Sequence, residues 1–256
     1  MKTKLQQISV FVIFALLWEL SVHTIADPFY IGSPSLLAGV LVKDLVSAGF
    51  YRDLGLTTQE LLLGYSIGAI GGVGTAVIFG RWPRLAVIFE PFFVALNSIP
   101  RIALAPLFVI WFGIDIASKV VLAATLVYFL TFFNALAGIQ SAEARLVNIG
   151  RIMGASSWQI FGKIVLPGAV AWIMTGLRTS LPFALIGVIV GEFVAASAGL
   201  GYRLNFYATS YNAAGTMAML VVMMVLMMGL NYLAQYIEDR LLVWRPKSTL
   251  RYTSAP

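Results

Sequence analysis

The stretch SKVVLAATLVYFLTFFNALAGI, residues 118–139, decides the class of this protein. Lys119 is its only charged residue, and long apolar side chains fill most of the other positions. A helix that crosses a bilayer needs about 20 mostly apolar residues. We therefore expect residues 118–139 to span a membrane.

The rest of the chain has the same character. Of its 256 residues, 60% are hydrophobic and 11% are charged, whereas soluble domains carry about 25% charged residues. We predict an all-α, polytopic membrane protein that forms one domain over residues 1–256. Its six expected transmembrane helices are Ile8–Ile25, Thr57–Phe79, Leu85–Ile99, Ser118–Ile139, Gly168–Val194 and Ala213–Tyr236.

Two of these spans need comment. The first follows Lys2 and Lys4 but lacks a clear cleavage site, so we interpret it as a retained helix rather than a signal peptide. The third continues past Pro100 as broken apolar sequence that reaches Phe112. A broken helix is tolerated in a membrane only where it faces protein or a water-filled cavity.

The basic residues predict the orientation, because Lys and Arg collect on the cytoplasmic side of inner-membrane proteins. A cytoplasmic N-terminus leaves Lys43, Arg52, Lys119 and Arg203 outside, whereas Arg101 and Arg178 lie within or beside spans. With six spans, both termini then lie in the cytoplasm. The cytoplasmic set is Lys2, Lys4, Arg81, Arg84, Arg145, Arg151, Lys163, Arg240, Arg245, Lys247 and Arg251.

Two local patterns predict packing. Ser33 and Pro34 are typical of a helix start, and apolar residues at helical spacing follow, so we expect an external amphipathic helix over Ser33–Phe50 on the membrane or on the bundle. Gly64, Gly68 and Gly72 recur every fourth residue. They form a smooth stripe on which another helix can pack closely.

Composition excludes several kinds of chemistry. The chain has no Cys and one His, which removes disulfides, thiolate metal sites and Cys nucleophiles. His23 has no nucleophile motif near it, so we interpret it as an incidental residue of the first span. The net charge of +6 comes from residues that flank apolar spans, and we expect no nucleic-acid partner. No Walker motif is present, so we expect this chain to bind no cofactor.

The connection between the fourth and fifth spans, about Gln140 to Leu166, is too long for a simple turn. Its apolar residues have helical spacing up to Met153, Gly154 supplies a bend, and Ser156 or Ser157 can cap a second short helix. Two short helices do not stay folded alone. The segment therefore either docks into a groove of a partner or rests on the membrane as a surface loop.

This segment resembles the "EAA" loop of binding-protein-dependent ABC importer permeases, which reads E-A-A-x-x-x-G, nine residues, then I-x-L-P. The sequences NIGRIMG (residues 148–154) and IVLP (residues 164–167) occupy these positions. Asn148 replaces the Glu of the motif, and Ile149 and Gly150 replace the two Ala. The resemblance implies a coupling loop over residues 140–167 with a docking role for Asn148, Arg151, Gly154, Ala155, Ser156, Leu166 and Pro167.

The resemblance also implies a mechanism and partners. An ABC ATPase subunit, which uses ATP and Mg, would dock on this loop and drive alternating access. A periplasmic or lipid-anchored binding protein would deliver the solute, and a second permease copy, in a homodimer, would complete the path in the inner membrane lipid. Further motifs are similar to the nitrate, taurine and sulfonate subgroup: Ile99-Pro100, Ala105-Pro106-Leu107, Trp111-Phe112-Gly113, Gly176-Leu177-Arg178, Glu192 and Gly199-Leu200-Gly201-Tyr202.

The solute class stays open between sulfonates, nitrate or taurine and a vitamin-like pyrimidine or aromatic molecule. Many sulfonate-type members carry Arg in the second span where this chain has Glu60. Permeases for vitamin-like pyrimidines tend towards T-x-x-E, which residues 57–60 match.

Polar residues within spans are candidates for the translocation path or a gate, because ionisable groups there usually face the bundle interior. For each, an alternative is an ordinary interhelical bond, a helix-end contact or a carboxylate in water. The candidates are Asn97, Arg101, Tyr128, Asn134 and Glu192.

Two other functions compete with an importer. A secondary transporter predicts inverted repeats and carboxylates for ion coupling within the membrane; no repeat is evident. An intramembrane enzyme needs a nucleophile with a base, or metal ligands, which a chain with one His and no Cys does not offer.

Overall fold

The computed structural model describes residues 2–24 and 31–241, and within these ranges all regular structure is helical. The elements are α1 (Lys2–Thr24), α2 (Pro34–Val46), α3 (Ala48–Arg81), α4 (Pro83–Ser98), the 3₁₀ turn η1 (Arg101–Leu104), α5 (Ala105–Phe112), α6 (Ile116–Gln140), α7 (Ala144–Ile152), α8 (Ser157–Ile160), the π-helical turn η2 (Phe161–Val165), α9 (Leu166–Ala195), α10 (Leu200–Thr209) and α11 (Ala213–Leu241).

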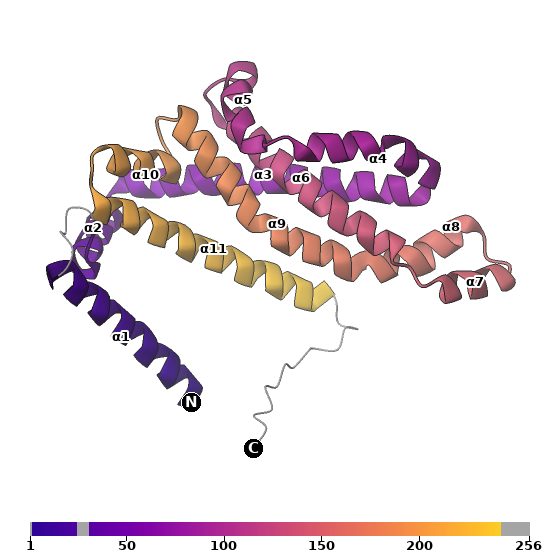
Figure 1. The fold of residues 1–256 in the computed structure, drawn as a ribbon, viewed down its shortest axis with the longest axis horizontal. Coiled ribbons are helices and arrows are strands. Elements are labelled where there is room, and N and C mark those ends of the chain that lie inside the picture. The colour runs from indigo at the N-terminus through magenta and orange to yellow at the C-terminus, as the bar shows by residue number, and fades with distance from the viewer. Residues whose placement is uncertain (1, 25–30, 242–256) are drawn as a thin grey trace.

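Helix α6 lies at the centre and packs along both α3 and α9. The long helices run between two ends of the molecule (Figure 1). Helices α7 and α8 form one end, which we call the α8 end, and α2 and α10 form the other, the α10 end. These two ends carry the features that matter for function.

Four helices in the described ranges are long and apolar enough to cross a membrane: Ala48–Arg81, Ile116–Gln140, Ser157–Ala195 and Ala213–Arg240. The pair Pro83–Ser98 and Arg101–Phe112 passes the same test together but is bent by 76°, so the expected break near Pro100 is present. The first expected span coincides with α1, whose apolar part Val12–Val22 is shorter, and Ile25 lies outside the described residues. The number six therefore stays a prediction.

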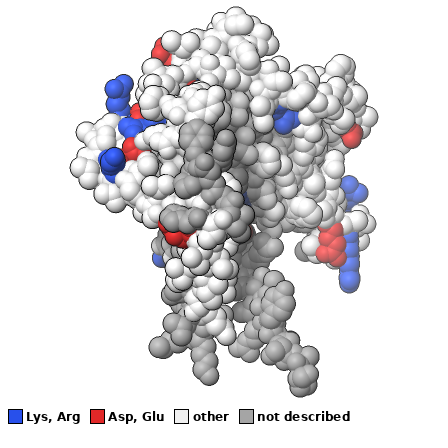
Figure 2. All heavy atoms as spheres, turned by 60° about the vertical axis from the view of Figure 1, so that its left-hand side comes forward, with Lys and Arg blue, Asp and Glu red and all other residues white. Residues whose placement is uncertain are grey.

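The surface agrees with a membrane environment. Most of the face shown in Figure 2 is uncharged, and the charged residues lie in small separate groups. Large apolar side chains are exposed on α1, α4 and α11; Ile13, Val87 and Met228, for example, are 56%, 72% and 65% exposed. In water this surface would be unfavourable, whereas lipid or a second protein can cover it.

The expected helix over Ser33–Phe50 is two elements. Ser33 caps α2 as predicted, because its hydroxyl accepts from the Leu36 N–H at 3.4 Å. The helix then stops at Val46, since Ser47 is extended, and Phe50 already belongs to α3. Helix α2 packs against α11 and α3, so it lies on the bundle.

The break has a physical reason. Asp44 and Asp53 are nine positions apart, and on one continuous helix they would point in opposite directions. Both bind Arg203 of α10. The turn at Ser47 brings the two carboxylates to the same guanidinium, which sequence periodicity does not reveal.

The glycine stripe behaves as predicted. A Cβ on Gly64 would lie 2.6 Å from the Cβ of Ala123, and one on Gly68 would lie 2.5 Å from the carbonyl oxygen of Ala124. A Cβ on Gly72 would overlap Thr131. Because these positions lack side chains, the backbones of α3 and α6 approach closely.

We expect Gly72→Ala to destabilise the protein by about 1–3 kcal/mol, the usual cost of overpacking a tight contact. Gly74→Ala is the matched control, because a Cβ on Gly74 meets nothing within 4 Å. Thermal unfolding of both variants in detergent measures the difference. Equal melting temperatures for the two variants would contradict a close α3–α6 contact.

Candidate functional site

The segment that connects α6 to α9 forms a compact helix–turn–helix at the α8 end (Figure 1). Helix α7 ends at Ile152, and Gly154 follows with φ +80°. That backbone conformation is one that side chains with a Cβ rarely adopt. The bend predicted at Gly154 is therefore present.

Ser156, rather than Ser157, caps the second helix. Its hydroxyl accepts from the Gln159 N–H at 3.3 Å, and the Gln159 side-chain oxygen accepts from the Ser156 N–H at 2.8 Å. This reciprocal pair is a capping box, which satisfies two backbone donors at once. The segment is thus fixed by its own hydrogen bonds as well as by contacts with the bundle.

Helix α8 continues into the membrane domain without a gap. It passes through the π-helical turn η2 into α9, where Leu166 is the first residue and Pro167 the second. Turns of this kind occur frequently at functional sites in helices. A displacement of α8 would therefore be transmitted directly to α9. No residue pattern predicted the π-helical turn.

The predicted coupling loop, residues 140–167 and from here on the coupling segment, has an inner and an outer face. Gly150 is buried, and a Cβ there would lie 3.1 Å from Ile164 Cδ1, so α7 packs closely on η2. On the outer face Ile152 is 86% exposed, Met153 80% and Trp158 63%. The predicted docking residues Asn148, Arg151, Gly154 and Ser156 are also exposed, whereas Ala155 and Leu166 are half-buried.

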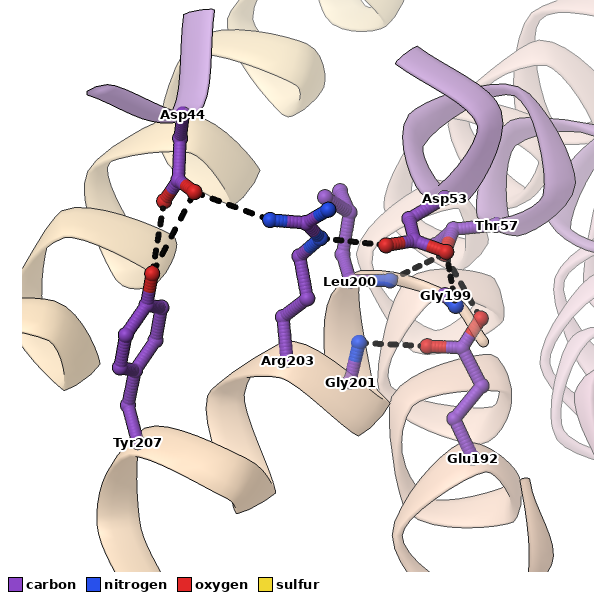
Figure 3. Close-up of polar contacts among 9 residues, drawn as sticks. All are labelled: Asp44, Asp53, Thr57, Glu192, Gly199, Leu200, Gly201, Arg203 and Tyr207. Carbon is purple, nitrogen blue, oxygen red and sulfur yellow. Dashed lines mark hydrogen bonds and ion pairs between the residues drawn. The ribbon is translucent and has the colours of Figure 1, made fainter. Parts of the chain in front are cut away.

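A second polar site lies at the α10 end, around Glu192 (Figure 3). This side chain is 1% exposed. Its carboxylate accepts from the Thr57 hydroxyl at 2.7 Å and from the Gly201 N–H at 2.5 Å. The Leu200 N–H donates to the same Thr57 hydroxyl at 2.8 Å. Side chains of α9 and α3 therefore bind the first amides of α10, which need partners outside the helix.

Arg203 extends this network to α2 (Figure 3). Its guanidinium donates to Asp44 at 2.9 Å and also to Asp53, which accepts from the Gly199 N–H at 3.0 Å. The Tyr207 hydroxyl donates to Asp44 at 3.1 Å. Burial, and next the charge of Asp44, raise the pKa of Tyr207, so the hydroxyl keeps its proton as a donor.

Two more charged side chains are buried near this network. Glu60 of α3 is 1% exposed, and its Oε2 has no hydrogen-bond partner within the described ranges. Lys119 of α6 is 3% exposed and donates to the carbonyl oxygens of Ile114 and, at 2.9 Å, Asp115. No functional role was predicted for Asp44, Asp53 or Arg203, because their charge near the span ends was the only signal in the sequence.

The predicted path residues do not form one cluster. Asn97 accepts from Arg101, whose guanidinium lies 4.3 Å from the ring centre of Phe129. Tyr128 donates to Thr75 at 2.9 Å, an α6–α3 bond. The other two lie elsewhere. Asn134 donates to the carbonyl oxygen of Leu130 on its own helix and packs against α9. Glu192 belongs to the network at the α10 end.

Comparison with known protein families shows which family this chain belongs to. Residues 64–243 match the family described as the binding-protein-dependent transport system inner membrane component. The chain belongs to this family. It is the membrane-spanning permease of an importer for a small solute, and this membership favours the importer over the secondary transporter.

Relatives of this permease support the assignment along nearly its whole length. It is 31% identical over 238 residues to the formylaminopyrimidine transport permease protein ThiX of Halalkalibacterium halodurans. That alignment covers 93% of this chain and 94% of the relative. It is 26% identical over 242 residues to the taurine transport system permease protein TauC of Escherichia coli, covering 91% and 86% of the two chains.

Solved structures agree on the fold. A chain of the MetNI methionine ABC transporter in an inward-facing conformation matches with a TM-score of 0.58 at 23% identity, covering 80% of this permease and 95% of that chain. An amino acid ABC transporter matches with a TM-score of 0.61 at 15% identity, with 79% and 94% covered. These similarities place the helical bundle in the permease fold.

We expect Glu192→Ala to destabilise the permease by roughly 2 kcal/mol or more, because the buried donors of Thr57 and Gly201 lose their acceptor. The loss should be local as well, with faster amide hydrogen exchange over residues 200–209. Glu192→Gln keeps a side-chain oxygen as an acceptor and should behave closer to wild type. Unchanged exchange in Glu192→Ala would show that other contacts hold α10.

Proposed function

We propose that the coupling segment is the docking site of a separate ABC ATPase, which uses ATP and Mg while this chain binds no cofactor. The observation that carries the proposal is the exposure of Ile152 and Met153 at the turn of a capped helix–turn–helix. Exposed apolar groups on a structured segment are typical of a protein interface. Docking there would act on α9, since α8 and α9 form the single candidate span Ser157–Ala195.

The orientation that follows places the α8 end in the cytoplasm and the α10 end outside. The α8 end carries Arg81, Arg84, Arg145, Arg151 and Lys163, in keeping with the positive-inside rule. Both termini are then cytoplasmic. Arg245, Lys247 and Arg251, which contribute to this prediction, lie outside the described residues.

A binding protein, periplasmic or lipid-anchored, would deliver solute at the α10 end, and a second copy of this chain would complete the path. The apolar side chains of α4 support the second copy, because this helix has no buried residue. Asn97, Arg101 and Tyr128 are proposed to line the path near the break after α4, with Asn134 further along α6. Glu192 is proposed as a gate residue because it joins α9 to α10.

The solute is proposed to be a sulfonate, nitrate, taurine or a vitamin-like pyrimidine or aromatic molecule. A relative named for riboflavin transport, from Chloroflexus aurantiacus, shares 31% identity over 189 residues, covering 73% of this chain and 70% of the relative. The riboflavin relative and the formylaminopyrimidine relative therefore have the same sequence identity to this chain, 31%. Sequence identity therefore does not choose between solutes, and an uptake assay with each of these molecules does.

The docking proposal is tested by co-expressing the permease with its candidate ATPase and binding protein. The assembly is then reconstituted, and ATPase activity is measured with and without loaded binding protein. We expect Gly154→Arg to lose both co-purification and stimulation, because the bend at φ +80° excludes most side chains. Gly39→Arg on α2 is the control, since a side chain there also meets open space.

A surface variant separates docking from folding. Ile152→Glu leaves the bend and the cap intact and changes one side chain that is 86% exposed, so the melting temperature should not change. It places a charge in an apolar interface and should weaken ATPase binding at least roughly 10-fold. Wild-type affinity in this variant, or solute transport by the permease alone, would argue against the proposal.

A further inference from the structure

The guanidinium of Arg81 lies close to two indole rings at the α8 end. It is 4.1 Å from the ring centre of Trp158 and 5.9 Å from that of Trp82. The indoles also contact each other, edge to face, with centres 6.4 Å apart and planes at 90°. We call these three residues the Arg81 clasp. Both distances are within the range of cation–π attraction.

The ring contacts are the main restraint on this arginine. Its Nε is buried and has no hydrogen-bond partner within the described ranges. In the same part of the chain no carboxylate forms an ion pair with it. A guanidinium is planar and weakly hydrated, so it stacks on aromatic faces more readily than an ammonium does. The position of Arg81 therefore depends on Trp158.

The clasp connects two elements that are far apart in sequence. Trp158 belongs to α8, the helix of the proposed docking site. Arg81 is the last residue of α3, and Trp82 is the corner that leads directly into α4. Cation–π contact between them ties the coupling segment to this corner.

Within this chain, helix α4 is held to the rest of the bundle mainly by apolar side chains. It has no buried residue, and among its neighbours it packs mainly on α3. Its aromatic side chains Phe89 and Phe93 contact Phe79 of α3. Phe93 also contacts three aromatic residues of α6, namely Tyr128, Phe129 and Phe132. Its far end leads to the bend before Arg101. Such apolar packing is less directional than hydrogen bonding, so α4 can shift when its first residue, where the clasp acts, is displaced.

Indoles and basic residues also gather at membrane interfaces as anchors. That alone explains the presence of Trp82, Trp158 and Arg81 at this level of the molecule. It does not explain why the guanidinium lies 4.1 Å over one ring and 5.9 Å from the other. An interface anchor would be satisfied by lipid headgroups and would need no contact between α8 and the α3–α4 corner.

We propose that Arg81 and Trp158 are positioning residues for energy coupling. Through their stacked contact, a displacement of α8 is passed to α4 as well as to α9. The ATPase would thus move both the continuous helix and the broken one that bears the proposed path residues Asn97 and Arg101. This inference rests on the proposed docking of an ATPase at α8.

The absence of Cys from the chain allows a direct test. Ser98→Cys places a single thiol at the exposed end of α4. The complex with ATPase is reconstituted, and the rate of maleimide labelling of this chain is measured before and after trapping with ADP and vanadate. We expect trapping to change the rate about 3-fold or more in the otherwise wild-type chain.

Three variants are added to this background. Trp158→Leu keeps apolar bulk but removes the ring, and we expect it to abolish the labelling change while the ATPase still co-purifies. Trp158→Phe keeps an aromatic face and should restore the change. Trp111→Leu is the matched control, because Trp111 is 62% exposed against 63% for Trp158, and it should behave as wild type.

The outcomes separate the two proposals. A labelling change that persists in Trp158→Leu, or that is absent from the wild-type background although the ATPase binds, overturns the role of the clasp and leaves docking intact. Failure of the ATPase to co-purify with the Trp158-containing chain overturns docking itself. Loss of the change in Trp158→Leu with recovery in Trp158→Phe supports the clasp, because a merely apolar role would not distinguish Leu from Phe.

Discussion

Polar groups buried between membrane helices have no water to bond with, so each must find its partner within the protein. At the α10 end Glu192 of α9 provides such a partner for polar groups of both α3 and α10. Its carboxylate accepts from Thr57 of α3 and from the first turn of α10. These bonds fix how α3, α9 and α10 lie relative to one another. Arg203 then fixes α2, and the interruption at Ser47 follows from the two carboxylates that it binds.

The α8 end is held by different forces. The coupling segment contacts the bundle through apolar side chains such as Phe161 and Val165, which pack on the cluster around Phe79 and Phe132. Apolar packing is less directional than a buried hydrogen-bond network, so small shifts there cost less. Helix α9 runs from this adaptable end to the fixed α10 end. A force applied at α8 would accordingly turn or shift α9 about its rigid far end.

Local spacing in the sequence predicted the parts of the structure that depend on near neighbours. The bend at Gly154, the cap at Ser156 and the glycine stripe of α3 each follow from residues within a few turns of one another. The network around Arg203 could not be found in this way, because its partners Asp44 and Asp53 are 159 and 150 positions away. Separation in sequence likewise hid the contact between Arg81 and Trp158, which are 77 positions apart. The break after α2 could not be predicted either, because it depends on the network around Arg203.

The departures from the E-A-A motif have a packing explanation. Gly150 stands where the motif has Ala, and a Cβ there would lie 3.1 Å from Ile164 and 3.4 Å from Ile160. Glycine therefore lets α7 approach η2 with two branched side chains between them. Asn148, at the position of Glu, is exposed and brings no charge to the outer face. The apolar residues Ile152 and Met153 dominate that face, so docking in this protein would depend on burial of apolar surface more than on an ion pair.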